Sequence, residues 1–327
     1  MITPCFFGTR LDGMYAATYE ITNTCNLTCK HCMNKSGKDS YPGMPLENVL
    51  ELIKEMYDIG VRSLYISGGE PLTYPDIDRV LYFCAKKGFK LSMATNGVLV
   101  PEHLDAIVAC VKDISVSLDG IGMAHDDFRG IPGMFDAVAK TFDYLRGKVN
   151  MIVSTVIWQG NKDMIEDIVR FVYEAGVSQI NFSYLVPLGR ATNMDIHINK
   201  EDYGKIQEKV TQLQNFYADK NLLILFRRSS RINADSLECA GGTKIIHATA
   251  TGKIAPCSWC AKMGEEQDDL LTWQWEQGNM EKCVSQICNL QNINQQRKEK
   301  FGYTGCPAMS WIYSRSFEAD DPLNILL

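Results

Sequence analysis

The feature that most constrains the fold is a regular alternation of strand-like and helix-like segments over residues 16–186. Short apolar, β-branched or aromatic runs predict six strands, at Ala16–Ile21, Ser63–Ser67, Lys90–Thr95, Asp113–Leu118, Met151–Ile157 and Gln179–Val186. Amphipathic stretches between them predict helices, at Leu46–Ile59, Ile77–Lys87, His103–Cys110, Phe135–Arg146 and Met164–Glu174. Because a helix separates each pair of strands, the strands must pair in parallel through right-handed crossovers. This pattern favours a barrel or part-barrel over an open sheet.

The alternation ends near residue 230. Residues 200–218 predict a further helix and Leu222–Phe226 a further strand. After Arg231, turns and cysteines replace the apolar periodicity. The last segment of about 90 residues has few long apolar runs, so bound metal would help it to fold. We therefore expect a barrel domain, residues 1–230, and a small cysteine-rich C-terminal domain, residues 231–327.

Charge and hydropathy argue against several classes of partner. The formal net charge is −6, and no basic tract stands out, so neither nucleic acid nor an anionic membrane surface is an expected partner. No apolar run reaches the roughly 18–20 residues that a membrane-spanning helix needs. The first residues lack the pattern of a signal peptide. We expect a cytoplasmic protein.

Twelve cysteines fall into groups that indicate metal binding rather than disulfide bonds. Three of them, Cys25, Cys29 and Cys32, form a C-x3-C-x2-C run directly after the first predicted strand. Six more lie in the last third of the chain: Cys239, Cys257, Cys260, Cys283, Cys288 and Cys306. Cys5, Cys84 and Cys110 are scattered, and we expect them to pack as small apolar side chains. The long gap between the two groups predicts two metal sites.

The first cysteine group suits an iron–sulfur cluster or zinc, because thiolates are soft ligands. Three closely spaced thiolates leave one corner of a four-iron cluster without a protein ligand, and a small molecule can bind there. A zinc ion would want a fourth ligand. His31 is the only nearby candidate, and its place beside Cys32 makes sharing one ion awkward.

Small polar motifs end the next three predicted strands. They are Ser67-Gly68-Gly69-Glu70-Pro71, Thr95-Asn96-Gly97 and Ser115-Val116-Ser117-Leu118-Asp119. Glycines let the backbone approach a ligand closely, and the Glu70 carboxylate can accept hydrogen bonds from an ammonium group. The carboxyl ends of barrel strands share one face, so these groups should meet at one mouth. The alternative is that they only cap turns.

Together, the cysteine spacing, the aromatic-type residue before Cys32 and the Gly-Gly-Glu turn closely resemble the radical S-adenosylmethionine superfamily. The resemblance implies a partial (β/α)6 TIM-like barrel with a [4Fe–4S] cluster on Cys25, Cys29 and Cys32 at its mouth. It implies that S-adenosylmethionine is cleaved reductively to a 5′-deoxyadenosyl radical that abstracts a hydrogen atom from the substrate. The cofactor contacts that it implies are Gly68, Gly69, Glu70, Thr95, Asn96, Ser117, Asp119, Arg129 and His31. Arg129 would pair with the methionine carboxylate, although a surface salt bridge is the alternative.

The second cysteine group, with Gly252-x4-Cys257 and Gly305-Cys306, resembles the SPASM and Twitch extensions of that superfamily, which carry auxiliary [4Fe–4S] clusters. The sequence departs from the full SPASM pattern, because no cysteine stands shortly before Cys306. The resemblance therefore implies at least one auxiliary [4Fe–4S] cluster. Its expected ligands are Cys239, Cys257, Cys288 and Cys306, with Cys260 and Cys283 as competitors. A zinc ribbon on the Cys257-x2-Cys260 pair stays open.

Such extensions resemble those of enzymes that crosslink, oxidise or epimerise ribosomally made peptides, and peptide modification is our leading hypothesis. The segment Pro187–Ala191 also resembles one found in that branch. The cysteine run begins at residue 25, so we expect the barrel or a separate protein to recognise the leader peptide. A flavodoxin or ferredoxin is the expected electron donor. The alternatives are a dehydrogenase or rearrangement enzyme acting on a sugar, nucleotide or tetrapyrrole, and a non-catalytic zinc-bound scaffold.

Overall fold

A computed structural model describes residues 15–194, 198–226, 239–263, 271–287, 289–302 and 305–320. The described strands form one sheet of ten, in the order β10-β9-β8-β1-β2-β3-β4-β5-β6-β7. They are β1 (Tyr15–Thr22), β2 (Val61–Gly68), β3 (Lys90–Thr95), β4 (Asp113–Ser117), β5 (Asn150–Ile157), β6 (Gln179–Tyr184), β7 (Leu223–Phe226), β8 (Ile245–Ala248), β9 (Lys253–Ala255) and β10 (Trp273–Gln274). Strands β1 to β7 pair in parallel, as their helical crossovers require.

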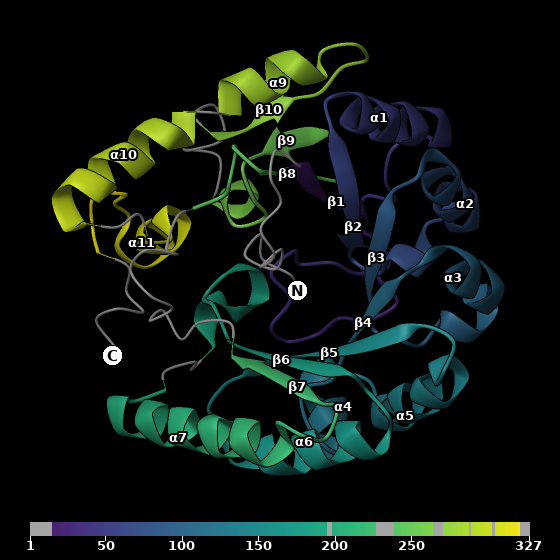
Figure 1. The fold of residues 1–327 in the computed structure, drawn as a ribbon, viewed down its shortest axis with the longest axis vertical. Coiled ribbons are helices and arrows are strands. Elements are labelled where there is room, and N and C mark those ends of the chain that lie inside the picture. The colour runs from purple at the N-terminus through teal and green to yellow at the C-terminus, as the bar shows by residue number, and fades with distance from the viewer. Residues whose placement is uncertain are drawn as a thin grey trace.

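Helices cover the outer side of the curved sheet (Figure 1). The α-helices are α1 (Leu46–Asp58), α2 (Ile77–Lys87), α3 (Leu104–Cys110), α4 (Met123–Arg129), α5 (Met134–Leu145), α6 (Ile165–Glu174), α7 (Lys200–Tyr217), α9 (Met280–Ile287), α10 (Asn289–Phe301) and α11 (Pro307–Ser314). Short 3-10 turns are η2 (Pro71–Thr73), η3 (Val100–His103), η4 (Lys162–Met164), η5 (Gly189–Asn193) and η7 (Cys260–Lys262). None of the helices in the described part of the chain combines the length and apolar character needed to cross a bilayer.

The predicted fold class, a partial barrel of βα units, is confirmed, and most boundaries fall within two residues of the prediction. The strand predicted at Gln179–Val186 was too long, because β6 ends at Tyr184. A tight turn follows, in which the N–H of Leu188 donates to the carbonyl of Val186 around Pro187, which has no N–H to pair. Helix α4 was not predicted, because seven residues between two glycines are too few to show a helical period.

The C-terminal segment extends the same sheet. Strand β8 pairs in parallel with β1, from Ala16 opposite Ile245 to Tyr19 opposite Ala248, and β9 and β10 follow as antiparallel strands. Strand β8 therefore occupies the barrel position next to β1. The division into domains at residue 230 falls outside the described residues and stays a prediction.

The inner and outer faces of the strands differ sharply. On β1, Tyr19 and Ile21 point outward into the apolar core under the helices, whereas Thr18 and Glu20 point inward to a cavity. The other strands turn small polar side chains to the same cavity: Ser67, Ser117, Ser154, Asn181 and Ser183. Closed (βα)8 barrels usually fill this space with valine, isoleucine and leucine. Small polar residues here leave it open to a ligand.

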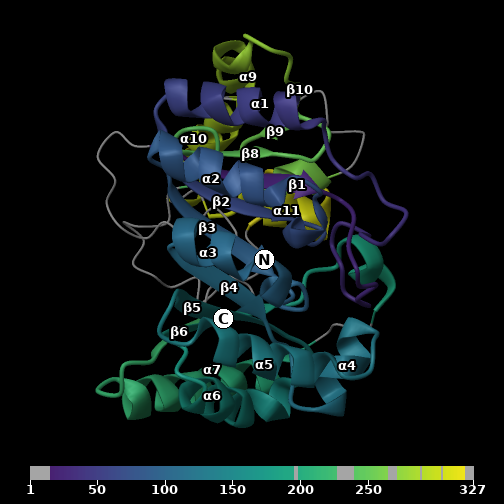
Figure 2. The same ribbon diagram turned by 90° about the vertical axis from the view of Figure 1, so that its right-hand side faces the viewer.

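A buried carboxylate joins the C-terminal segment to the barrel. Helix α9 lies beside α1 (Figures 1 and 2), and Glu55 of α1 is only 9 % exposed. Its Oε2 accepts hydrogen bonds from Trp275 Nε1 at 3.2 Å and from the N–H of Met280 at 3.1 Å. Its Oε1 accepts from the N–H of Gly278 at 2.5 Å. Glu55 thus satisfies backbone N–H groups at the start of α9, where a negative charge is also favoured.

We predict that Glu55→Gln lowers the free energy of unfolding by about 1–3 kcal/mol, because the amide NH2 would face a buried N–H donor. Urea denaturation followed by circular dichroism measures the change. The matched control is Glu51→Gln on the same helix, where the carboxylate accepts from Lys54 at 2.7 Å in an i,i+3 surface pair. We expect the control to cost no more than about 0.5 kcal/mol. Equal effects of the two substitutions would contradict the role of Glu55.

Candidate functional site

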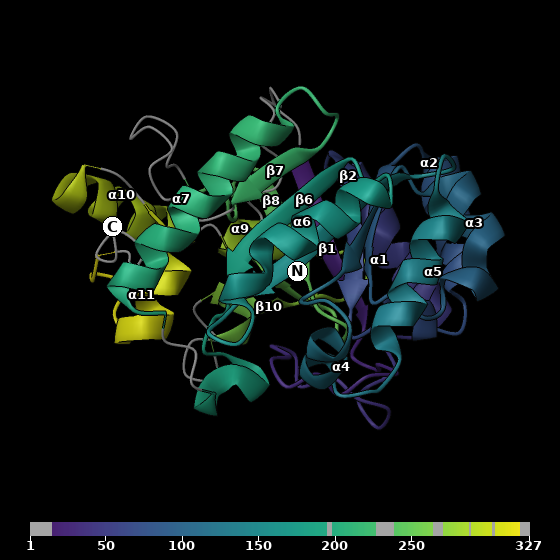
Figure 3. The same ribbon diagram turned by 90° about the horizontal axis from the view of Figure 1, so that it is seen from below.

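The predicted site residues gather at the carboxyl end of the barrel. The loop that carries the first cysteines, α4 and the turn after β6 all lie at this end (Figure 3). They border a cavity with about 1170 Å³ of space, including its open mouth. Barrel active sites lie at this face, because the βα loops meet there.

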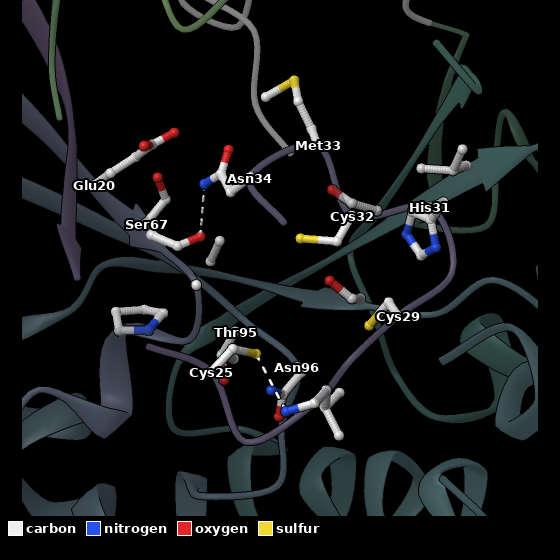
Figure 4. Close-up of a pocket in the computed structure, with 18 of the residues that line it drawn as sticks. Glu20, Cys25, Cys29, His31, Cys32, Met33, Asn34, Ser67, Thr95 and Asn96 are labelled. Atoms are coloured by element: carbon white, nitrogen blue, oxygen red, sulfur yellow. Dashed lines mark hydrogen bonds between the residues drawn. The ribbon is translucent and has the colours of Figure 1, made fainter. Parts of the chain in front are cut away.

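The thiols of Cys25, Cys29 and Cys32 line the cavity and face one common space (Figure 4). Burial raises the pKa of Cys25 to about 12 and also raises that of Cys29. Ligation would have to displace these protons. In the described residues, no three His, Cys, Asp or Glu side chains converge as a single metal ion would require. A [4Fe–4S] cluster is wider and takes its thiolates at separate corners, so this donor set fits one.

The Gly-Gly-Glu turn supports the backbone of the cysteine loop. The N–H of Gly69 donates to the carbonyl of Thr22 at 2.7 Å, and the N–H of Glu70 donates to the carbonyl of Thr24 at 2.9 Å. A Cβ on Gly69 would collide with the carbonyl oxygens of Thr24 and Asn23. The glycine is therefore needed for this close backbone contact.

Arg190 holds the other side of the cysteine loop. Its Nε donates to the carbonyl of Cys29 at 2.7 Å and its Nη1 to the carbonyl of Ser36 at 2.8 Å. Its backbone N–H donates to the carbonyl of Cys32 at 3.0 Å. The Pro187–Ala191 segment, whose role the sequence left open, thus ties the end of β6 to the cysteine loop.

Glu70 lies behind the cavity wall. Its carboxylate accepts hydrogen bonds from Thr95 Oγ1 at 2.9 Å, from the N–H of Asn96 at 2.7 Å and from the N–H of Leu72 at 3.2 Å. Burial raises the pKa of Glu70 to about 7, against the effect of these bonds. The carboxylate links the ends of β2 and β3, and its contact with an ammonium group stays a prediction.

Asp119 also lies behind the wall, where it holds Arg129. Arg129 Nη2 lies 2.5 Å from Asp119 Oδ2, and His31 Nε2 lies 3.7 Å from the same oxygen. Burial by itself raises the pKa of Asp119, but the Arg129 guanidinium and the neighbouring imidazoles hold it below its usual value. The ring of His31 stacks on Phe128, with centroids 4.1 Å apart.

The remaining predicted cofactor contacts reach the cavity. Those on its wall are Gly68, Gly69, Thr95, Asn96, Ser117, Arg129 and His31. Within the described residues, Arg129 Nε and His31 Nδ1 are buried without a hydrogen-bond partner. Buried polar atoms are rarely left unpaired, so these two fit a site that is completed by a polar ligand.

The structure brings four of the C-terminal cysteines together. Cys257 and Cys260 have their sulfurs 3.5 Å apart, and Cys239 and Cys306 lie close enough to interact with Cys260. Cys283 belongs elsewhere, since its sulfur lies 3.2 Å from Asn279 Oδ1 on the side of α9. The predicted ligand Cys288 lies outside the described residues. Of the two competitors, Cys260 is therefore the one beside Cys239, Cys257 and Cys306.

Sequence reasoning missed eight polar residues of the cavity wall: Thr18, Glu20, Asn34, Ser154, Asn181, Ser183, His247 and Ser258. Thr18 and Glu20 alternate with apolar residues on β1, which is the available signal for an inward-facing pair. His247 lies in a four-residue strand whose partner, β1, is more than two hundred residues earlier in the chain. No local sequence pattern predicts the pairing of β8 with β1.

Comparison with known proteins identifies the family. The family model of the Radical SAM superfamily matches residues 19–196, more than half of the chain. The chain belongs to the radical SAM superfamily. A [4Fe–4S] cluster and S-adenosylmethionine are the cofactors of this superfamily, and its barrel accounts for the site just described.

Relatives of this radical SAM protein differ in what they act on. It is 28 % identical to an AdoMet-dependent heme synthase of Nitratidesulfovibrio vulgaris over 266 residues, 74 % of this chain and 72 % of that protein. It is 26 % identical to the antilisterial bacteriocin subtilosin biosynthesis protein AlbA of Bacillus subtilis over 249 residues, 74 % of this chain and 54 % of that protein. Streptococcus suis SuiB bound to S-adenosylmethionine shares the fold, with a TM-score of 0.74 at 16 % identity, over 94 % of this chain and 76 % of that one.

We predict that Gly69→Ala in this radical SAM protein displaces the cysteine loop, because the added methyl group meets backbone rather than a flexible side chain. Such overpacking costs about 1–3 kcal/mol. We expect less iron after anaerobic reconstitution and a lower free energy of unfolding. The control is Gly204→Ala on α7, where a Cβ meets nothing within 4 Å. It should raise helix stability by up to about 1 kcal/mol and leave the iron content unchanged. Normal iron content in Gly69→Ala would contradict the packing argument.

Proposed function

We propose that this radical SAM enzyme modifies a peptide. The observation that favours this substrate is a cavity lined by hydroxyl and amide side chains, whose charged residues are engaged by other protein groups. Cys25, Cys29 and Cys32 would hold the cluster. The methionine part of the cofactor would lie between the Gly68–Gly69 backbone and Arg129. When bound, these groups supply a 5′-deoxyadenosyl radical that removes a hydrogen atom from the substrate. The barrel must keep water and other hydrogen donors away from it.

The charges around the cavity support a peptide over an anionic small molecule. Carboxylate-rich tetrapyrroles and nucleotide phosphates are usually held by arginines and lysines that pair with their charges. Among the described residues of the wall, two arginines occur, and both are engaged. Arg129 pairs with Asp119, and Arg190 donates to carbonyls of the cysteine loop. The hydroxyl and amide side chains on the inner faces of the strands suit the neutral amides of a peptide.

The relatives favour two substrate classes. AlbA takes part in subtilosin biosynthesis, and SuiB has been crystallised with the precursor peptide SuiA, so both support a peptide. The identity of 28 % to a heme synthase favours a tetrapyrrole as the second candidate. The scarcity of unengaged cations on the described wall argues against this second candidate.

The C-terminal cysteines would form the second metal site. We assign Cys239, Cys257, Cys260 and Cys306 as ligands of one auxiliary [4Fe–4S] cluster, because four thiols are what such a cluster takes from protein. This assignment replaces Cys288, which lies outside the described residues, by Cys260. A flavodoxin or ferredoxin would deliver the electron, and a separate protein could present the peptide.

We predict that replacing Cys25, Cys29 and Cys32 together by Ala abolishes 5′-deoxyadenosine formation. About four irons should stay bound at the C-terminal cysteines, the content of one [4Fe–4S] cluster. Chromatography of the nucleoside and iron analysis under anaerobic conditions measure both. The matched control is Cys84→Ala, which removes a buried thiol from α2 on the outside of the barrel. Deoxyadenosine formation in the triple variant would reject the assignment.

A substrate test compares three probes: an equimolar pool of synthetic decapeptides, GTP and a carboxylate-bearing iron porphyrin. We expect the peptide pool to raise the rate of deoxyadenosine formation above the substrate-free rate. Mass spectrometry should then show peptides altered in mass by the loss of hydrogen. Stimulation by the iron porphyrin or by GTP, with none by the peptides, would contradict the proposed substrate class.

A further inference from the structure

One part of the cavity wall has no role in the site described so far. It consists of Thr18, Glu20, Asn34, His247 and Ser258, which we call the polar patch. Glu20 and Asn34 lie on the same side of the cavity (Figure 4). In the sequence, Asn34 follows Cys32 by two residues and Ser258 directly follows Cys257, so the patch contains a neighbour of each cysteine group.

The pairing of β1 with β8 creates the centre of this patch. The parallel register places Thr18 opposite His247, and Thr18 Oγ1 lies 2.6 Å from His247 Nδ1. Glu20, two residues further along β1, has Oε1 3.7 Å from His247 Nε2. Its Oε2 accepts a hydrogen bond from Lys262 Nζ at 2.7 Å. The carboxylate is thus neutralised by Lys262, and one of its oxygens stays beside the imidazole.

Three buried polar atoms of the patch lack a hydrogen-bond partner within the described residues. They are His247 Nε2, Ser258 Oγ and Asn34 Oδ1. The side chains of His247 and Ser258 are almost wholly buried, with 1 % and 5 % of their surface exposed. Leaving a buried polar group unpaired is costly, and native proteins seldom keep several together without a use. Their position on a cavity wall indicates that a ligand completes them.

The protonation of His247 determines what it offers to that ligand. Burial lowers the pKa of His247 to about 4, so the ring is neutral near pH 7. Burial raises the pKa of Glu20, but Lys262 and His247 hold it below its usual value, so Glu20 is ionised. A carboxylate oxygen near Nε2 favours the tautomer with the proton on Nε2. Nδ1 then accepts from the hydroxyl of Thr18, and the Nε2–H is a donor at the cavity wall.

We propose that the polar patch recognises the substrate by binding a backbone amide of the peptide. The Nε2–H of His247 donates to the amide carbonyl, Asn34 Oδ1 accepts from an amide N–H, and the hydroxyl of Ser258 adds a second polar contact. An uncharged group with a donor and an acceptor matches this set, whereas a carboxylate or phosphate would find no unpaired cation among the described residues here, because Lys262 is already engaged by Glu20. The inference rests on the proposed function, because it names how a peptide is held in the same cavity.

The first test uses His247 variants and the decapeptide pool. The measured quantity is the pool concentration that gives half-maximal stimulation of deoxyadenosine formation. We expect His247→Ala to raise it about ten-fold or more, the scale of one lost hydrogen bond to a buried partner. His247→Gln keeps an N–H donor and should recover most of the affinity. The control is His103→Ala, whose ring pairs with Asp78 at 2.7 Å away from the cavity, and it should leave the value unchanged.

The second test uses Ser258→Ala. Within the described residues the Ser258 hydroxyl makes no hydrogen bond, so its removal should not destabilise the fold. We expect its free energy of unfolding to stay the same or to rise, while the half-maximal pool concentration increases. A hydroxyl with a purely structural role would give the opposite result, lower stability with unchanged affinity.

The outcomes separate this inference from the proposed function. If the pool stimulates the wild-type enzyme, and His247→Ala and Ser258→Ala both bind it as the wild type does, the polar patch is not the recognition site. If the pool fails to stimulate the wild-type enzyme and the iron porphyrin does so, the proposed peptide function itself is wrong, and the amide-binding role falls with it.

Discussion

The cysteine loop has no regular secondary structure, and its shape depends on backbone hydrogen bonds from two neighbouring strand ends. Gly69 and Glu70 donate to it from the end of β2, and Arg190 donates to it from the turn after β6. These contacts fix the loop from opposite sides, so the three thiols face one space without a helix or strand to carry them. Precise placement of a functional group needs such support from rigid elements. The barrel therefore supplies the rigid support, and the hydrogen bonds to the cysteine loop position its three thiols.

Among the described residues, two buried ion pairs border the cavity. Arg129 is matched by Asp119, and Glu20 by Lys262. Removing one member of such a pair would leave an uncompensated charge in a poorly solvated place, which is costly. The pairs also leave the cavity with little net charge for a substrate to meet. Electrostatics at this site thus serves to orient side chains such as Arg129 and His247. Under the proposed amide-binding role, recognition would depend on neutral hydrogen bonds.

The sequence predicted what depends on local patterns. Alternating periods located the strands and helices of the barrel, and the spacing of Cys25, Cys29 and Cys32 located one wall of the cavity. It could not predict contacts between distant segments, such as β8 beside β1 or Glu55 of α1 at the start of α9. The sequence singled out Glu70 and Asp119 as ligand contacts, which stay predictions, and it could not show that both also pair with neighbouring protein groups. The sequence shows these residue types, but it does not show the protein groups with which they pair.

The place of β8 has a consequence for how enzymes of this kind can diverge. The N-terminal part of the chain supplies the cysteine loop and the Gly-Gly turn, whereas His247, Ser258 and Lys262 all come from the C-terminal part. One barrel position is therefore filled from the C-terminal part of the chain. Replacing that segment would present a new set of side chains to the substrate while the radical-generating half stayed as it is. The C-terminal part of the gene could then vary with the substrate, while the N-terminal part, which encodes the cysteine loop, stayed the same.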